Sequence, residues 1–511
     1  MSKKDLETTY DIVIIGSGLS GLICAYVLSK EGYNVCILEK NKQVGGCLQT
    51  FARDKCIFDV GVHYIGGLAE GQTLNQYFKY FDIRDQLKVQ QMDMDAFDCI
   101  SFDGDHKDYT LAQEYGRFED NLWRQFPKEK ASIHAYTKAL KDICSKFPLY
   151  NLEIDKAYPT AMDHLQLNAQ ATIADLTDDA TLRAVLGGNN LLYAGKGAST
   201  PFFLHAMVVN SYIESAWRCV DGGSQIARSL VKNIRKNGGK IFKRKEVDRF
   251  VFSGDKIKAV VLTSGERIAT NHVISSAHPS QLSRFVTGTK GHLRKAYLNR
   301  INRTAATPSV FSVHYTLKPD TVPYTNSNYY HSTTKDVWNI IDHNHNNWPA
   351  TYLALTPTTS KSADYADSFA AMTYMEYDEV KQWENSFNTI SQEANRGAGY
   401  EAFKNQKAAK LLEQLYKKFP QLKGNIQGTY ASTPLSFRDY IGSPTGSMYG
   451  FERNCNDPMR TALAIQTRIP NLSLTGQNIN VHGILGVTVS AVLACMNFVD
   501  REKLLKDIVS A

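Results

Sequence analysis

The chain has 511 residues, of which 43% are hydrophobic and 21% are charged, and its formal net charge is +7. This length exceeds what one simple core serves, so we expect two or three globular domains. No apolar run reaches the roughly 18 residues of a transmembrane helix, and the polar N-terminus lacks the apolar core of a signal peptide. These features predict a cytoplasmic protein, and they leave open peripheral contact with the inner face of the membrane.

The nine cysteines are scattered, odd in number and never spaced as CxxC. This distribution argues against a disulfide framework and a zinc site, so no metal is expected. Much of the positive charge lies in residues 232–245, KNIRKNGGKIFKRK. We interpret this stretch as a solvated helix and strand, with contact to anionic lipid headgroups as the alternative. No nucleic-acid motif accompanies it, so no nucleic-acid partner is predicted.

Residues 10–40, YDIVIIGSGLSGLICAYVLSKEGYNVCILEK, predict one βαβ unit. Between its first strand and its helix, Gly16, Gly18 and Gly21 form the pattern G-x-G-x-x-G. The first glycine permits a tight turn, the second lets backbone amides approach a pyrophosphate, and the third packs the helix against the strand. The N-terminus of the helix stabilises phosphate charge. A dinucleotide site is therefore predicted here, with Ser20 in the same turn.

Glu39 closes the second strand of this unit, and Lys40 follows it. A carboxylate at this position accepts hydrogen bonds from ribose hydroxyls and repels a 2′-phosphate, which disfavours NADP. Gly45 and Gly46 follow, and a second glycine pair lets the chain cross close to a pyrophosphate and ribityl chain. The pair favours FAD over NAD as the bound dinucleotide.

Residues 56–67, CIFDVGVHYIGG, place a His-Tyr pair among glycines that weaken a strand. We expect Gly61 and Gly66 to let the chain pass under a flat ring. His63 and Tyr64 then face alternate sides of a strand. Histidine titrates near working pH, and tyrosine is a weaker donor that is stable in an apolar site. Both are candidate proton donors, and simple packing beside the cofactor is the alternative.

Residues 221–224 open a further helix that ends at Gly238-Gly239, and residues 240–275 predict a strand meander. In the tail, a strand ends at Gly476, and a glycine loop leads into a helix that begins at about Val487. A helix N-terminus there stabilises negative charge on a reduced flavin ring. His482, in the approaching loop, is the third catalytic candidate.

The remaining segments, roughly 85–215 and 290–440, are rich in Tyr and Phe, so the cofactor elements are discontinuous in sequence. Trp217 and these segments are compatible with a long apolar tunnel and equally with an ordinary core, and packing is the better interpretation of Tyr449. No second G-x-G-x-x-G is present, so a separate NAD(P)H domain is not predicted. The electron donor is then NAD(P)H docking in the substrate cleft or another donor protein.

The chain resembles the flavin-dependent carotenoid and retinoid oxidoreductases, which include phytoene desaturases and carotenoid isomerases, and it is most similar to the retinol saturases. Four stretches carry the resemblance: GGCLQTFARDKCIFDVGVHYIG, FFLHAMVVNSYIESAWRCVDGGSQIA, STPLSFRDYIGSPTGSMYG and IPNLSLTGQNINVHGILGVTVSAVLAC. It implies an α/β fold with a Rossmann-like FAD-binding domain and a discontinuous α+β substrate-binding domain. The implied FAD domain comprises residues 8–84, 216–288 and 440–511, and the substrate domain comprises residues 85–215 and 289–439.

Residue by residue, the resemblance and the motifs together imply FAD contacts at Gly16, Gly18, Ser20, Gly21, Glu39, Lys40, Gly45, Gly46, Val247, Gly476, Gln477, Gly486 and Val487. One departure concerns the tail, where many relatives carry an acid at the position of Gln477. The retinol saturases resemble this chain in having Gln there, but an acid is expected at the next position, which is Asn478. An amide still bonds a ribityl hydroxyl, so FAD binding is expected to survive this change.

The implied reaction saturates a carbon–carbon double bond of a polyene or isoprenoid lipid. It needs a hydride from flavin N5 and a proton from His63, Tyr64 or His482. The first alternative is a desaturase or isomerase of carotenoid-like or other long-chain lipids with the same fold. The second is a flavin-binding protein that acts on a non-lipid substrate such as an amine.

Overall fold

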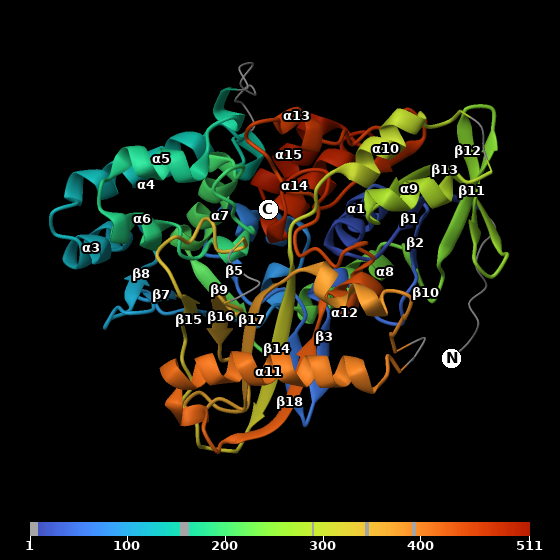
Figure 1. Cartoon of the computed structure of the whole chain (residues 1–511). Coiled ribbons are helices and arrows are strands. Elements are labelled where there is room, and N and C mark those ends of the chain that lie inside the picture. The colour runs from blue at the N-terminus through green and yellow to red at the C-terminus, as the bar shows by residue number, and fades with distance from the viewer. Residues whose placement is uncertain (1–8, 154–162, 289–290, 343–346, 391–394) are drawn as a thin grey trace.

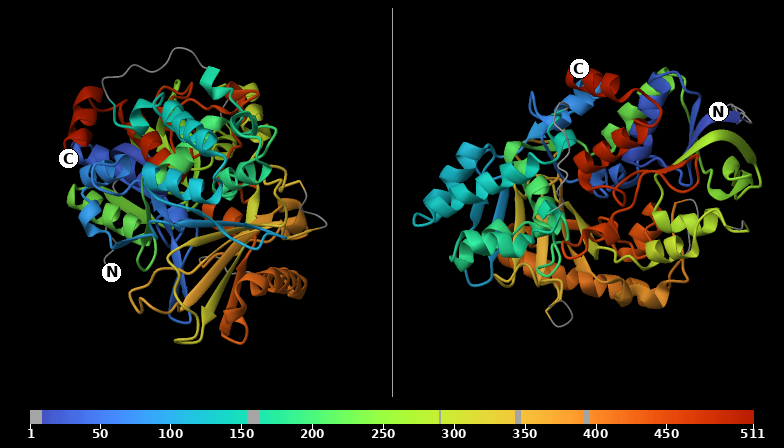
Figure 2. Two further views of the ribbon diagram at one scale, coloured as in Figure 1. Left: turned by 90° about the vertical axis from the view of Figure 1, so that its left-hand side faces the viewer. Right: turned by 90° about the horizontal axis from the view of Figure 1, so that it is seen from above.

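The computed structural model describes residues 9–153, 163–288, 291–342, 347–390 and 395–511 (Figure 1). Two large sheets lie in different parts of the molecule, and the helices of residues 115–214 gather on one side of them (Figure 1 and Figure 2). Residues 8 and 289, where two predicted domain segments begin, lie outside the described residues. The mixed architecture confirms the predicted α/β fold class.

The first sheet has the strand order β10-β2-β1-β13-β12-β11, with β19 beside β13. Strands β10, β2, β1, β13 and β19 run parallel to one another, and the β1–α1–β2 part confirms the predicted βαβ unit. The strands are β1 (Thr9–Ile15), β2 (Val35–Glu39), β10 (Lys240–Lys243), β11 (Val247–Ser253), β12 (Lys256–Leu262), β13 (Arg267–Ser275) and β19 (Leu472–Leu474).

The predicted meander over residues 240–275 is wrong at its first strand. Only β11, β12 and β13 are antiparallel neighbours, whereas β10 runs parallel to β2 at the sheet edge. The cause is the preceding helix α8 (Ser224–Lys236), which packs against α1 (Leu19–Lys30) and returns the chain to that edge as a crossover.

Helix α14 (Gly483–Cys495) packs against α1, which is almost wholly buried, and α14 is itself buried over most of its second half. It begins four residues before the predicted start at Val487, and Gly486 lies inside its first turns and serves close packing. A Cβ on Gly486 would lie 2.4 Å from the carbonyl oxygen of Val481. Nearby helices are α2 (Thr73–Tyr80), α9 (Leu282–Phe285), α10 (Lys295–Arg303), α13 (Pro458–Thr461) and α15 (Arg501–Val509).

The second sheet has the order β18-β14-β17-β16-β15-β7-β8, with all neighbours antiparallel except the β15–β7 pair. Helix α11 (Ala398–Lys418) lies along its lower side in Figure 1, and α12 (Pro434–Ile441) lies toward the first sheet. The strands are β7 (Asp98–Phe102), β8 (Tyr109–Leu111), β14 (Ser309–Leu317), β15 (Asn328–Ser332), β16 (Thr351–Leu355), β17 (Ser368–Met375) and β18 (Ile426–Ser432).

Each large sheet takes its strands from one of the two proposed domains, and we keep those boundaries as a proposal. Two small sheets join them: β3 (Thr50–Arg53) with β4 (Cys56–Asp59), and β9 (Ala216–Cys219) between β5 (Ile65–Gly66) and β6 (Val89–Gln91). Because β6 belongs to the proposed substrate segment and β9 to the proposed FAD segment, the second of these sheets crosses the boundary.

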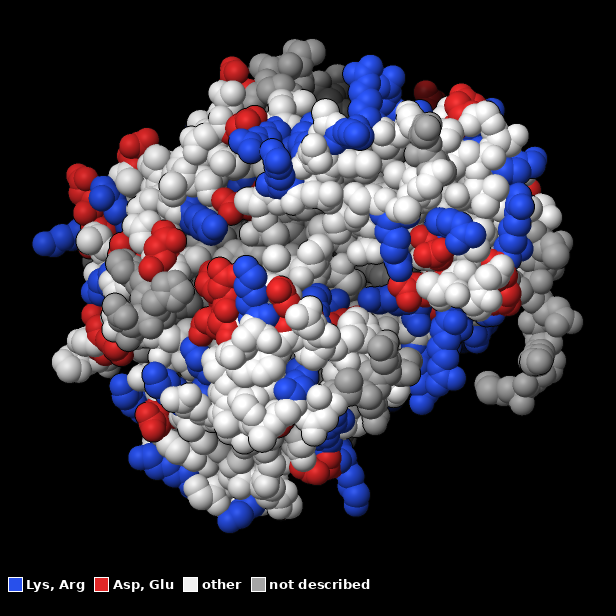
Figure 3. Space-filling view, turned by 45° about the vertical axis from the view of Figure 1, so that its right-hand side comes forward, with Lys and Arg blue, Asp and Glu red and all other residues white. Residues whose placement is uncertain are grey.

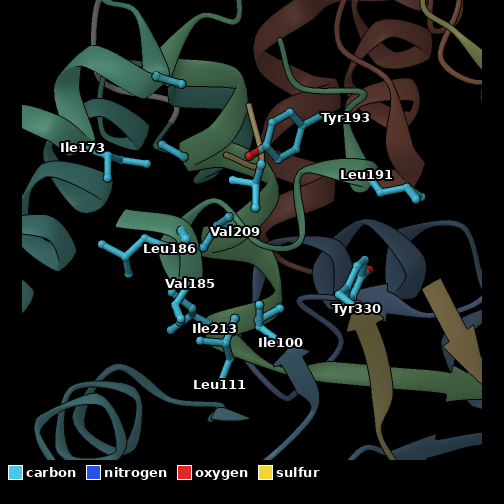
Figure 4. Close-up of a cluster of buried hydrophobic side chains, with 14 of the residues drawn as sticks. Ile100, Leu111, Ile173, Val185, Leu186, Leu191, Tyr193, Val209, Ile213 and Tyr330 are labelled. Carbon is cyan, nitrogen blue, oxygen red and sulfur yellow. The ribbon is translucent and has the colours of Figure 1, made fainter. Parts of the chain in front are cut away.

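The helical group packs an apolar core against β7 and β15. Ile100, Leu111, Val185, Val209 and Ile213 point into one cluster there (Figure 4). The helices of this group are α3 (Tyr115–Gln125), α4 (Lys130–Cys144), α5 (Ala169–Leu176), α6 (Ala180–Leu186) and α7 (Phe202–Glu214).

A fully buried histidine in this core predicts acid sensitivity. His205 Nε2 lies 2.8 Å from the Tyr136 hydroxyl and Nδ1 lies 2.8 Å from the Tyr193 hydroxyl, and burial lowers its pKa from 6.5 to about 3. The unfolded chain therefore binds a proton before the folded chain does, so stability present above pH 6.5 is lost as the pH falls toward 3.

We expect wild type to lose about 1 kcal/mol of unfolding free energy through His205 when the pH falls one unit below its ordinary pKa. Urea titrations at about pH 6.5 and about pH 5.5 measure this loss, and His205→Gln removes the His205 contribution. His134→Gln, at a side chain 69% exposed, is the control and keeps the wild-type dependence. If the unfolding free energy of His205→Gln falls between the two pH values as much as that of wild type, the prediction is contradicted.

Within the described residues, no helix is long and apolar enough to cross a bilayer. The basic stretch of residues 232–245 forms the end of α8 and strand β10. Its exposed cations are Lys232, Arg235, Lys236, Lys243 and Arg244, as the interpretation of a solvated helix and strand requires.

Candidate active site

A cavity of about 820 Å³ extends from the first turn of α1, past the N-terminus of α14, to one face of the second sheet. One face of the molecule is hollowed near its centre, with Lys, Arg, Asp and Glu side chains around the recess (Figure 3). Every predicted cofactor contact except Gly21 lines this cavity, as do His63, Tyr64 and His482. The chain therefore brings together residues that lie more than 400 positions apart in sequence.

The β1–α1 turn has the geometry of a phosphate cradle. Gly16 has a φ of +93°, and a Cβ on Gly21 would lie 2.3 Å from the Gly16 carbonyl oxygen. Gly21 therefore allows close packing and does not face the cavity, whereas a Cβ on Gly18 would meet nothing within 4 Å. Gly18 also precedes α1 without a side-chain cap, which leaves first-turn amides available to an anion.

The carboxylate of Glu39 is buried at the end of β2 and fixed by the turn beside it. Its Oε2 accepts hydrogen bonds from the Ser17 amide at 3.0 Å and the Ser17 hydroxyl at 2.6 Å, and its Oε1 accepts one from the Asn41 amide at 2.7 Å. A carboxylate has further acceptor sites, so Glu39 can still bind ribose hydroxyls. Lys40 donates to the Asp439 carbonyl at 3.1 Å, and burial lowers its pKa.

The glycine pair after β2 approaches the β1–α1 turn itself. Gly45 pairs with Gly18 in an isolated parallel bridge, and a Cβ on Gly46 would lie 3.2 Å from the Gly18 Cα. Gly45 and Gly46 have φ angles of +117° and +56°. The pair thus lets two backbone segments meet beside the cradle, and both segments line the cavity.

The tail loop closes the other side of the cavity. Gly476 has a φ of +108° and donates to the Ser490 hydroxyl at 3.0 Å. Asn478 Oδ1 accepts from the Phe451 amide at 3.0 Å, so this oxygen is already used inside the protein. Arg453, which sequence reasoning missed, donates to the carbonyls of Asn478 and Thr461 at 3.2 and 2.6 Å and fixes the loop.

These residues fit a flavin dinucleotide. The space beside Gly18 is open where a pyrophosphate approaches, and α1 and α14 both begin at this cavity without side-chain caps. Orphan amides at the two N-termini supply donors for the pyrophosphate and for a reduced ring. Val247, Gly486 and Val487 line the same cavity.

Residues 19–384 match the family model described as flavin containing amine oxidoreductase. The chain belongs to this family. It is an FAD-dependent oxidoreductase, as its motifs predict.

This flavoprotein is 27% identical to all-trans-retinol 13,14-reductase of Homo sapiens, over 99% of this chain and 88% of that protein. It is 24% identical to the chloroplastic prolycopene isomerase of Arabidopsis thaliana, over 87% of this chain and 74% of that protein. These relatives confirm the resemblance to carotenoid and retinoid oxidoreductases. An oxidoreductase structure from Methanosarcina mazei has the same fold, with a TM-score of 0.62 and 15% identity over 95% of this chain and 100% of that one.

In this oxidoreductase Gly61 and Gly66 both line the cavity, and each also lets another segment approach closely. A Cβ on Gly66 would lie 2.5 Å from the Ser211 carbonyl oxygen, so this glycine lets β5 approach α7. A Cβ on Gly61 would lie 3.2 Å from the Cys47 Cβ. Asp59 does fix a turn, but that turn opens α8, because its Oδ1 accepts from the Gly223 amide at 2.7 Å.

The expectation that one strand runs through His63 and Tyr64 is wrong, because β4 ends at Asp59 and β5 begins at Ile65. The two side chains differ in environment. Burial, together with the nearby Arg218 charge, lowers the pKa of His63 to about 4, so its imidazole is neutral at physiological pH. Burial raises the pKa of Tyr64 well above its ordinary value, so its hydroxyl keeps its proton.

His482 directly precedes α14, and its side chain is held in one tautomer. Its Nε2 lies 3.1 Å from the Leu192 carbonyl oxygen, which only an N–H can satisfy, and burial lowers its pKa to about 4. Its ring stacks on Tyr449 with centroids 4.2 Å apart. The donor N–H is thus engaged, which favours a positioning role for His482. Tyr449 lines the cavity, against the packing interpretation, whereas Trp217 does not.

Three further residues were missed from sequence. His278 lines the cavity, and its Nε2 is buried without a hydrogen-bond partner in the described residues. Asp98 and Arg218 are buried behind the wall at 0% and 1% exposure. In the sequence, Asp98 and Arg218 stand out only as charged residues within short apolar strands, DCISF and AWRC.

Proposed function

We propose that this enzyme reduces a carbon–carbon double bond of a polyene or isoprenoid lipid of the retinoid or carotenoid class. The observation that carries the proposal is the apolar continuation of the FAD cavity. Val310, Leu353 and Met372 line it from the second sheet, and Met207 and Val208 line it from α7. The relatives named for a retinol reduction and for a prolycopene isomerisation support the same substrate class.

The strand register places Leu353 and Met372 in one row. Ser312 of β14 lies opposite Met372 of β17, which lies opposite Leu353 of β16. Directly opposed residues project from the same face of a sheet. This face therefore offers a long apolar wall that excludes water and holds an extended chain in contact with the cofactor end of the cavity.

FAD, when bound, supplies the hydride chemistry. The chain must orient the double bond and provide a proton for the second carbon. His63 is neutral, and the Nε2–H of His482 is engaged with Leu192, whereas Tyr64, which lines the cavity, keeps its hydroxyl proton. We therefore assign the proton donation to Tyr64.

The electron donor in this proposal is NAD(P)H docking at the same cavity or a separate donor protein. Contact with a membrane surface belongs to the proposal as well, because Phe387 lines the cavity with 36% exposure and Ile390 beside it is 58% exposed. Sedimentation with anionic vesicles tests this contact, and Phe387→Ser is expected to weaken it.

The reaction is tested by product mass. Holoenzyme is incubated without oxygen with NADPH or NADH and all-trans-retinol or a carotenoid, and the extract is analysed by mass spectrometry. A product heavier by two hydrogen atoms is expected. A product of unchanged mass would support the isomerase instead, and a lighter product would support the desaturase. Turnover of an amine such as putrescine alone would overturn the lipid assignment.

A further inference from the structure

A buried chain of hydrogen bonds lies behind one wall of the cavity. The Tyr64 hydroxyl lies 2.7 Å from the Tyr330 hydroxyl and 3.2 Å from Asp98 Oδ2. Tyr64 lines the cavity, and its ring stacks at 4.1 Å on Tyr212, which lines the cavity as well. Tyr64 therefore connects the cavity wall to a carboxyl group that has 0% exposure.

The carboxyl group of Asp98 is held by neutral donors. Asn328 Nδ2 donates to its Oδ1 at 2.9 Å, and Asn189 Nδ2 donates to its Oδ2 at 3.1 Å. Arg218 donates to Asn328 Oδ1 at 2.7 Å, so one amide separates the guanidinium from Asp98. Because none of the cations that the structure describes contacts the carboxyl group directly, its ionised form has less support than it would have in a buried ion pair.

The strand register brings Asp98 and Tyr330 to the face of the second sheet that lines the cavity. Tyr330 of β15 lies opposite Leu353, which lines the cavity, and Asp98 of β7 lies opposite Asn328 on the same face of the sheet. The hydroxyl pair and the carboxyl group thus continue the apolar row described above. They form its polar end.

We propose that Asp98 is a positioning residue that controls where the hydroxyl proton of Tyr64 points, and so when Tyr64 can protonate the substrate. This inference rests on the proposed reductase function. When Asp98 is ionised, its carboxylate accepts the hydrogen bond of Tyr64 and withdraws that proton from the cavity. When Asp98 is protonated, it donates to the Tyr64 oxygen, and the Tyr64 proton turns to Tyr330 or to the substrate.

The reduction adds a hydride and a proton to the two carbons of the double bond. One carbon of the double bond gains the hydride, whose electrons come from a reduced nicotinamide nucleotide by way of the cofactor. The other carbon gains the Tyr64 proton, so a C–H bond forms as the Tyr64 O–H bond breaks. The phenolate then takes the proton of Asp98 and becomes a phenol again. Asp98 is left as a carboxylate, which solvent reprotonates before the next turnover.

Titration of Asp98 gives the step a pH dependence. Burial raises its pKa to about 6, against the opposing hydrogen bonds from Asn328, Asn189 and Tyr64 and the Arg218 charge. The titratable groups facing it are Tyr64, Tyr330 of β15, Tyr212 of α7, Arg218 of β9 and Cys99 of its own strand. Its protonated fraction falls about tenfold per pH unit above its pKa, so the proton-transfer step slows as the pH rises.

The experiment compares FAD-loaded wild type, Asp98→Asn, Tyr64→Phe and Tyr136→Phe. The last is a matched control, because it removes a buried tyrosine hydroxyl that bonds His205 away from the cavity. Infrared spectra of wild type minus Asp98→Asn across a pH series report the protonated carboxyl of Asp98 without turnover. Anaerobic reoxidation of the reduced protein by a polyene, in H₂O and D₂O, gives the rate of the chemical step.

We expect Tyr64→Phe to slow reoxidation by about 100-fold or more with loss of the solvent isotope effect, and Asp98→Asn to slow it by at least about tenfold with loss of the pH dependence. The Tyr136→Phe variant keeps the wild-type rate and profile. A wild-type profile in Asp98→Asn, or no carboxylic acid band near neutral pH, would overturn the proposal. If the wild-type protein shows the carboxylic acid band but no polyene reoxidises the reduced protein, the proposed reductase function is contradicted and the protonation of Asp98 is not.

Discussion

Replacement of Gly18 by valine is expected to abolish FAD binding while leaving the fold intact. Gly18 has a φ of −63° and a ψ of 171°, which any residue adopts, and its Cβ would meet nothing within 4 Å. The added side chain therefore fits the apoprotein but fills the space that a pyrophosphate needs. We expect FAD affinity to fall by about 100-fold or more, which is about 2.7 kcal/mol, with little change in unfolding free energy.

Flavin fluorescence titration measures the affinity, and urea unfolding of apoprotein measures the stability. Gly116→Val is the matched control, because a Cβ there also meets nothing within 4 Å but lies in α3, away from the cavity. Gly21→Ala should behave in the opposite way: its methyl group meets the Gly16 carbonyl at 2.3 Å, so the apoprotein itself loses stability. Normal FAD binding by Gly18→Val would contradict the assignment of the β1–α1 turn as the pyrophosphate site.

Replacement of Arg218 by methionine is expected to cost about 3 to 5 kcal/mol of unfolding free energy. The guanidinium is 1% exposed and donates to the carbonyls of Thr356 at 2.6 Å and Ser327 at 2.9 Å. Strand β9 thereby attaches to the loops and strands of the second sheet. Methionine fills much of the volume of the Arg218 side chain. It leaves the two carbonyl oxygens buried without donors, and the loss of these hydrogen bonds dominates the change in stability.

Urea unfolding of the holoenzyme measures this cost. Arg117→Met is the control, because that side chain is 51% exposed and its ion pairs with Asp95 and Glu114 lie at the surface. We expect the control to change stability by less than about 1 kcal/mol. Equal stabilities of Arg218→Met and the control would contradict the structural role of Arg218.

The dinucleotide end of the site was predictable because local rules determine it. A strand, a glycine turn, a helix and a terminal acid must occur in a fixed order, so Gly18 and Glu39 could be assigned from spacing alone. The register of β10 and the start of α14 could not be predicted from the sequence. They depend on how α8 and α14 pack against α1, which is tertiary information.

The catalytic end of the site depends on contacts between distant segments. Tyr64 stood out beside glycines, but its partners Asp98 and Tyr330 lie 34 and 266 positions away. Nothing local marks Asp98 as a partner of Tyr64. The contact between Gly66 and the Ser211 backbone is likewise tertiary, and nothing in residues 56–67 indicates it.

We propose that one cavity holds FAD and a polyene in contact. To test this directly, the FAD-loaded protein is reduced without oxygen, excess reductant is removed, and the absorbance of oxidised flavin is followed after a polyene is added. We expect the oxidised spectrum to recover with the polyene and not with a saturated analogue of the same length. A protein that retains no FAD, or a reduced flavin that no polyene reoxidises, would contradict it.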